Sequence, residues 1–174
     1  MNIIDYHLYL LFVAQQQFFG INIKNIKKLY RLDNRNEGEG FFLEGFSNMR
    51  IGDFEVINIE KTLFSSWNSQ LNKNPWNHFE IVIPTLIELV SATNEITAKS
   101  TGIIVDFVVG LHQIPPDEFN TCSDEDHNQL FTFNQNFIVA QSSFPLTNRA
   151  SQLIETPVFI IHTENLIADG VKLN

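Results

Sequence analysis

Short apolar runs separated by polar turns follow one another along the chain. The runs are rich in β-branched and aromatic residues, which favour extended backbone. They cover residues 9–13, 18–23, 54–59, 79–83, 102–109, 137–140 and 158–161. Neither a long amphipathic helical pattern nor an internal repeat interrupts them. The pattern predicts about eight to ten short strands in a closed or sandwiched all-β body.

Several local patterns are more specific. Runs 9–13 and 18–23 flank a polar turn at 14–17, which predicts a hairpin. Residues 45–50 and 54–59 flank Gly52-Asp53 and predict a second strand pair. Residues 59–67 and 164–167 predict short helices, whereas 85–98 fits either a helix or an extended segment, and 33–40 predicts a loop.

The segment 102–118 is the most informative stretch. Branched apolar residues interrupted only by Asp106 predict one buried strand over 102–109. Gly110 permits a sharp turn, and Pro115-Pro116 ends ladder pairing and begins a loop. A buried carboxylate needs hydrogen-bond partners, so we expect Asp106 to hold nearby backbone or a basic side chain.

Composition narrows the class of protein. The 174 residues are 44% hydrophobic, which is too apolar for disorder and fits one domain over 1–174. A net charge of −9 disfavours nucleic acid and anionic membranes as partners. One cysteine excludes an internal disulfide framework. With no membrane-length apolar run and no basic leader before 8–14, we expect a soluble, cytoplasmic protein.

The sequence contains few candidate catalytic or metal-binding residues. His78, His112, His127 and His162 lack metal-ligand spacing, and Cys122 has no CxxC partner. Phosphate-loop and nucleophile-elbow patterns are absent, and Gly38-Glu39-Gly40 carries a carboxylate where phosphate needs donors. We therefore expect no catalytic residue, cofactor or metal.

Basic residues concentrate between positions 24 and 35. Two interpretations remain open: a docking patch for an acidic partner, or a solvated basic face, which we favour. The residues are Lys24, Lys27, Lys28, Arg31 and Arg35.

Five segments in fixed order resemble the motifs of CheW domains, the chemotaxis adaptor family. The hairpin 9–26 is similar to "YLxFxLxGxxYGIPIxxVxEI", 45–59 to "GVxNLRGxVxPVIDL", and 102–118 to "GLLVDEVLGVxxLPPE". Residues 79–83 match the intervening strand, and 137–144 with 157–167 loosely match "YxxGVAxL" and "GxLVLLLDLEKLL". The resemblance spans roughly residues 8–167.

The chain departs from the family motifs at several positions. Ile51 replaces the glycine that follows the motif arginine, and Lys28 stands where an acidic residue is expected. Glu55 and Asn58 replace a proline and an aspartate, and the loops 33–44 and 84–101 are long for the family. Whether the Lys28 and Ile51 departures remove a partner contact stays open.

The resemblance implies two small five-stranded barrels packed together. It also implies a non-catalytic adaptor that couples a methyl-accepting chemoreceptor tip to the regulatory domain of a CheA-type histidine kinase. The implied partner-binding residues are Asn48, Met49, Arg50, Val105 and Phe107. The alternative is a small β-barrel enzyme or ligand-binding domain with an unrecognised pocket. The receptor, the kinase, the cellular output and the oligomeric state stay open.

Overall fold

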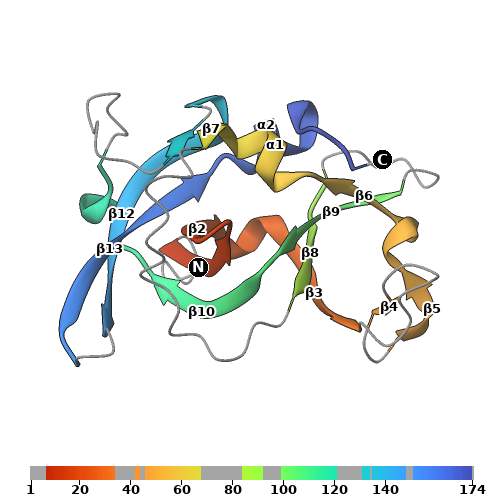
Figure 1. The fold of residues 1–174 in the computed structure, drawn as a ribbon, viewed down its shortest axis with the longest axis horizontal. Coiled ribbons are helices and arrows are strands. Elements are labelled where there is room, and N and C mark those ends of the chain that lie inside the picture. The colour runs from red at the N-terminus through yellow and green to blue at the C-terminus, as the bar shows by residue number, and fades with distance from the viewer. Residues whose placement is uncertain are drawn as a thin grey trace, which may run out of the picture.

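The computed structural model is mainly β and contains two large sheets (Figure 1). It describes residues 7–33, 42–43, 46–67, 84–91, 99–120, 131–133, 135–147 and 151–173. The predicted strand 79–83 and most of the predicted loop 33–40 lie outside the described residues. Two short helices, α1 (Ile59–Leu63) and α2 (Thr163–Asp169), lie near one another on the side of the molecule that is uppermost in Figure 1.

The first sheet has five strands. In spatial order these are β10 (Phe107–Gln113), β1 (Leu8–Ala14), β2 (Gln17–Asn22), β13 (Leu153–Ile161) and β12 (Ile138–Thr147). Strands β1 and β2 form the predicted hairpin with a two-residue turn. Strand β13 pairs in parallel with β2 only over Val158–Ile160, so the first half of β13 extends beyond that pairing together with β12.

The second sheet has six strands. In spatial order these are β5 (Phe46–Arg50), β4 (Phe42–Leu43), β3 (Ile26–Asp33), β8 (Thr85–Leu89), β9 (Ser100–Val105) and β6 (Phe54–Ile57). The ambiguous region after residue 84 is therefore extended at its start. A separate pair joins β7 (Phe64–Trp67) to β11 (Phe131–Phe133).

Both large sheets curl back on themselves. Strands β5 and β6 lie at opposite ends of the second sheet, yet only the short 3-10 turn η3 (Ile51–Asp53) joins them. The four Cα–Cα steps from Arg50 to Phe54 span at most roughly 14 Å, so these ends of the sheet must approach each other. In the first sheet Asn120, which follows β10 and η5 (Pro116–Glu118), forms a bridge to Gln141 of β12. The rings of His112 and Phe144 lie 4.3 Å apart between the same two strands.

The all-β class with two subdomains is confirmed. Each curled sheet takes the place of a predicted barrel, although the second has six strands. Within the described residues neither sheet is closed by a continuous ladder. The predicted pairing of 45–50 with 54–59 is wrong, because β5 pairs with β4 and β6 pairs in parallel with β9.

Three hydrophobic clusters fill the molecule. The first inner cluster belongs to the five-stranded sheet and includes Tyr9, Leu11, Val13, Phe18, Val158 and Ile160. The second inner cluster belongs to the six-stranded sheet and consists of Tyr30, Leu32, Phe54, Val56 and Leu86, with Ile51 and Ile104 against it. The shared core draws on both sheets and contains, among others, Leu10, Phe12, Phe19, Ile87, Ile103, Phe159 and Leu166.

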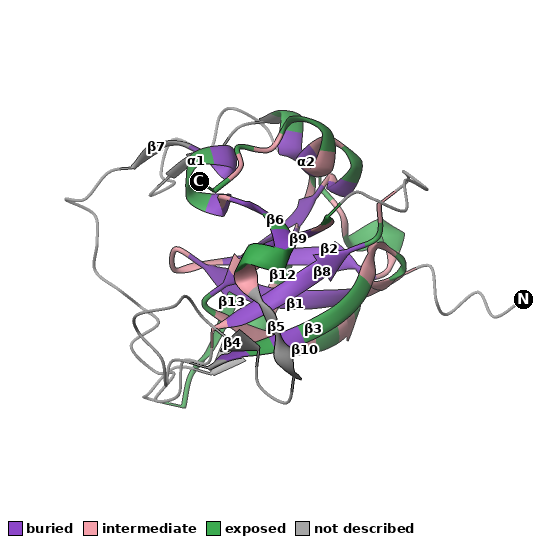
Figure 2. Cartoon of the chain, turned by 90° about the vertical axis from the view of Figure 1, so that its right-hand side faces the viewer, coloured by how far each residue is buried: buried purple, intermediate pink, exposed green. Residues whose placement is uncertain are grey.

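Strand β1 contributes to two of these clusters at once. Its odd-numbered residues point into the first inner cluster, and its even-numbered residues point into the shared core. Successive side chains of a strand face opposite sides, so a strand between two cores is apolar throughout. Figure 2 shows this burial along the central strands.

The segment 102–113 departs from the prediction of one strand. Strand β9 ends at Val105, Asp106 forms a bend, and β10 continues in the other sheet as far as Gln113. Gly110 therefore lies inside β10 and does not end it. The φ of Gly110 is +151°, a value that glycine adopts readily because it has no Cβ. The pairing of β10 with β1 is irregular at this point, between Leu11 and Phe12, as in a β-bulge.

Candidate partner-binding surface

Residues 105–107 form a crossover between the two sheets, and Asp106 fixes it to the first hairpin. The Asp106 N–H donates to the Val13 carbonyl at 2.9 Å, and its carboxylate Oδ2 accepts from the Gln15 N–H at 3.0 Å. Gln15 and Gln16 have φ values of 49° and 66°, as a two-residue type I′ turn requires. The prediction that Asp106 holds nearby backbone is confirmed.

The environment of Asp106 shifts its protonation equilibrium. Partial burial raises the pKa of the carboxyl group above its ordinary value, and the hydrogen bond from Gln15 opposes that shift only in part. The residue remains solvent-exposed. Its two hydrogen bonds to the first hairpin give Asp106 its structural role.

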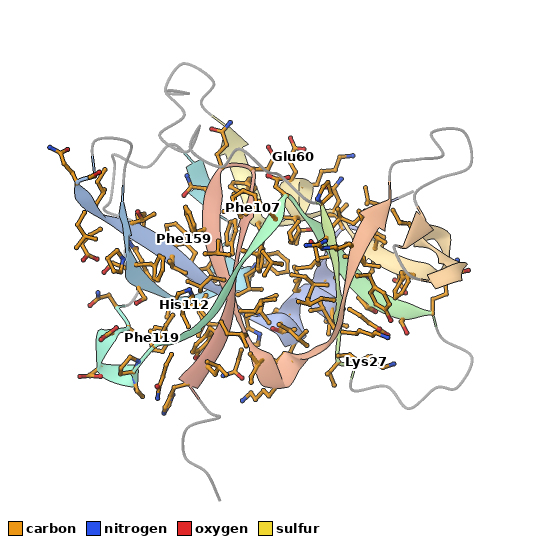
Figure 3. The ribbon with its side chains drawn as sticks, turned by 90° about the horizontal axis from the view of Figure 1, so that it is seen from below. Lys27, Glu60, Phe107, His112, Phe119 and Phe159 are labelled. Carbon is orange, nitrogen blue, oxygen red and sulfur yellow. The ribbon has the colours of Figure 1, made fainter. Side chains whose placement is uncertain are left out.

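The predicted residues on either side of Asp106 are not equally accessible. Val105 is 1% exposed and belongs to the shared core, so it cannot contact a partner in this conformation. Phe107 is half-buried against the first inner cluster and pairs with Val13 in the ladder. Of these two residues, Phe107 is the one that a partner can reach (Figure 3).

Asn48, Met49 and Arg50 occupy the last three positions of β5. The Arg50 backbone lies opposite Phe42 of β4, and no other strand among the described residues pairs with the outer edge of β5. Figure 1 places β5 at one end of the molecule, whereas β10 crosses its middle. The fold therefore distributes the predicted site over two places, an edge strand and a crossover.

A buried polar group that the sequence did not reveal lies in the six-stranded sheet. Glu88 of β8 is 3% exposed, and its Oε2 accepts from the Tyr30 hydroxyl at 2.8 Å. Lys27 Nζ lies 3.2 Å from the other carboxylate oxygen, and Ser100 also hydrogen-bonds to the side chain. The group joins β3, β8 and β9. The signal available was a carboxylate inside the apolar run 86–90, as at Asp106.

These contacts determine the protonation of Glu88 and Tyr30. Burial alone would raise the pKa of Glu88, but the hydrogen bonds from Tyr30, Ser100 and Lys27 and the charge of Lys27 outweigh it, so the pKa lies below its ordinary value. Burial, together with the hydrogen bond and the charge of Glu88, raises the pKa of Tyr30 to about 12. Glu88 is thus an ionised structural acceptor that is enclosed by its own partners.

The basic residues of β3 are partly engaged within the sheet. Lys27 pairs with Glu88, and the Lys28 ammonium lies 5.3 Å from the centroid of the Tyr30 ring. Lys24 and Arg31 are exposed, and Arg35 lies outside the described residues. These contacts fit the solvated basic face better than a dedicated docking patch. Figure 3 shows Lys27 far from Phe119, on the other side of the molecule.

The side chains of His112 and His162 make structural contacts. His112 packs edge-on against Phe144, and His162 Nδ1 accepts from the Asn165 N–H at 3.2 Å, which caps α2. His78, His127 and Cys122 lie outside the described residues. In the part of the chain that is described, no three His, Cys, Asp or Glu side chains are placed to hold a metal ion. No described helix is both long and apolar enough to cross a bilayer.

Comparisons with known proteins find similarity among solved structures. No protein-family model matches the chain, and no curated protein sequence matches it. Among solved structures, the chain is similar to the scaffolding protein TtCheW from Thermoanaerobacter tengcongensis. The two are 12% identical, the match covers 89% of this chain and 83% of that chain, and the TM-score is 0.47. A similarity at this level gives no information about function. The protein that it names is of the family that the sequence motifs resemble.

Proposed function

We propose that this chain is a non-catalytic signalling adaptor. It couples a methyl-accepting chemoreceptor to the regulatory domain of a CheA-type histidine kinase in the cytoplasm. The position of the Asn48–Arg50 motif on the edge strand β5 carries the proposal. An edge strand offers unpaired backbone groups, and an arginine fork adds a directional contact to carboxylates or carbonyls.

The contacts of two described carboxylates support a binding role over a catalytic one. Glu88 is bonded to Tyr30 and Lys27, and Asp106 is bonded to the backbone of Gln15. Both carboxylates hold strands together and are engaged by the chain itself. An enzyme instead requires titratable groups that face a substrate.

Arg50→Glu tests the proposal. Reversing an arginine at an interface removes a donor fork and places like charges together, which costs on the order of 2 to 5 kcal/mol if the pair is desolvated. We expect a large loss of affinity for the kinase regulatory domain, measured by titration calorimetry, and a melting temperature that changes little.

Arg31→Glu is the matched control, because Arg31 is an exposed arginine of β3 in the same sheet. It makes the same change in net charge and should leave the affinity near that of the unaltered chain. Equal losses in both variants would indicate a general charge effect. An unchanged affinity in Arg50→Glu would show that Arg50 takes no part in binding.

A further inference from the structure

The outer edge of β6 is covered by the segment Val171–Leu173, which follows α2. The Asn58 N–H donates to the Val171 carbonyl at 2.6 Å, and the Leu173 N–H donates to the Val56 carbonyl at 2.7 Å. Lys172 lies opposite Ile57 in an antiparallel bridge. The two hydrogen bonds lie on either side of the Ile57–Lys172 pair, which is therefore a non-hydrogen-bonded pair of an antiparallel ladder. In such a pair the Lys172 N–H points away from β6. Figure 1 shows the C-terminal end beside β6.

Polar contacts hold this segment more than burial does. The Val171 N–H donates to the Thr62 hydroxyl at 2.8 Å, and Lys172 Nζ lies 3.3 Å from Glu55 Oε1. Val171 and Leu173 remain 43% and 46% exposed. A half-exposed ion pair contributes little to stability, and short segments with few buried contacts open before the rest of a fold. Lys172 Nζ also donates to the Ile167 carbonyl of α2 at 3.3 Å, so the contacts that hold the segment are few and mainly polar.

Gly170 connects α2 to the segment Val171–Leu173. Its N–H donates to the Leu166 carbonyl at 2.9 Å and closes α2, whose Leu166 is anchored in the shared core. A Cβ at Gly170 would collide with that carbonyl and with Ile57. Gly170, with extended backbone angles, thus joins the anchored helix to the segment Val171–Leu173.

We propose that β6 is a strand-addition site that the chain itself occupies with Val171–Leu173. An extended peptide of another protein can replace this segment if it carries a basic residue between two apolar ones. The peptide would accept from the Asn58 N–H, donate to the Val56 carbonyl and place its cation beside Glu55. Strand addition of this kind gains affinity from main-chain bonds and selectivity from alternate side chains. The proposal does not depend on the adaptor function, because its test uses a defined peptide.

The test uses a chain that ends at Gly170 and an acetylated peptide with the sequence of residues 170–174. We expect the peptide to shift the Asn58 amide resonance of the shortened chain saturably, and to bind the full chain at least about tenfold more weakly, because its own segment competes. N-methylation at the peptide leucine should abolish binding, since it removes the donor to Val56. N-methylation at the peptide lysine is the matched control and should be tolerated.

A folded shortened chain that does not bind the peptide overturns the proposal, as does equal binding to both chains. Hydrogen exchange of the full chain decides the matter if the shortened chain does not fold. The Asn58 and Leu173 amides should then exchange together and at least about 100-fold faster than the Ile87 and Ile103 amides of β8 and β9. Exchange as slow as that of Ile87 would show that the segment leaves only on global unfolding, which contradicts the proposal.

Discussion

The interiors of the two sheets are built from different chemistry. The first inner cluster is held by apolar side chains, with Phe18 and Val158 fully enclosed. The second inner cluster contains Tyr30, whose hydroxyl is bonded to the buried carboxylate of Glu88. Both clusters lie in sheets that share one further core.

The two sheets should therefore differ in what stabilises them: apolar burial in one, and a hydrogen-bonded buried carboxylate in the other. Apolar burial is non-directional and does not depend on protonation, so the five-stranded sheet should respond to lost volume. A buried carboxylate is stable only with its partners, so the six-stranded sheet should respond to pH and to lost hydrogen bonds. In the observed register Lys28 lies opposite Glu88, and Lys27 and Tyr30 both contact the Glu88 carboxylate.

The largest effect is expected in the apolar interior. Phe18→Ala removes a fully buried ring and leaves a cavity, and should lower the free energy of unfolding by about 3 to 5 kcal/mol. Denaturant titrations should give the same loss at about pH 7 and about pH 4.5, since the contacts that the substitution removes are apolar.

Leu153→Ala is the matched control. Leu153 belongs to β13, as Val158 of the first inner cluster does, but it is 70% exposed. Its replacement should change the free energy of unfolding by about 0.5 kcal/mol or less. A small loss for Phe18→Ala, or a loss that varies with pH, would contradict the contrast between the two interiors.

Glu88→Gln should have the next largest effect. Its charge-assisted hydrogen bonds are replaced by neutral ones, and we expect a loss of about 1.5 to 3 kcal/mol at neutral pH. The folded-state pKa of Glu88 lies below its ordinary value of 4.5, so the ionised carboxylate contributes stability above that pH. That contribution disappears as the pH falls through the folded-state pKa.

Denaturant titrations of both proteins from neutral to acidic pH measure this difference. The gap between the unaltered chain and Glu88→Gln should stay constant above the ordinary glutamate pKa and close below it. Tyr30 gives a second check at alkaline pH, because its pKa of about 12 means that stability is lost as the pH rises from 10.0 toward that value. A gap that is independent of pH would mean that Glu88 is not ionised in the folded protein.

The smallest effect is expected at the crossover. Asp106→Ala removes the acceptor for the Gln15 N–H and should cost about 1 kcal/mol in the free energy of unfolding. Asp106→Asn keeps an oxygen acceptor and should cost less. Because the pKa of Asp106 is raised in the folded state, protonation of Asp106 adds to the free energy of unfolding of the unaltered chain. This contribution is complete below the ordinary aspartate pKa and is lost as the pH rises through the folded-state pKa. Equal losses for both variants at neutral pH would show that the hydrogen bond to Gln15 has no energetic role.

Local elements were predictable from the sequence, whereas their pairing was not. The β1–β2 hairpin and α2 follow from apolar periodicity and a polar turn, which are local signals. The break at Asp106 was missed because one carboxylate without a glycine or proline does not mark a change of sheet. Strands β5 and β6 were predicted as a pair because sequence neighbours usually pair, but a curled sheet places them at opposite ends.

The candidate site was predictable only where it depends on neighbouring residues in the sequence. The motif around Arg50 could be found because its residues are consecutive. The structural role of Asp106 could be expected because a carboxylate within an apolar run calls for hydrogen-bond partners. The burial of Val105 depends on how two sheets pack and has no local signal. The group around Glu88 depends on strand register, which brings Tyr30 to Glu88 across 58 positions of the sequence.

The proposed adaptor function is tested most directly by titrating the unaltered chain against the regulatory domain of a CheA-type kinase from the same organism. Analytical size exclusion and calorimetry should show a saturable one-to-one complex whose formation leaves both folds intact. No complex at concentrations of about 100 µM, where even contacts of modest affinity are populated, would contradict the proposed function.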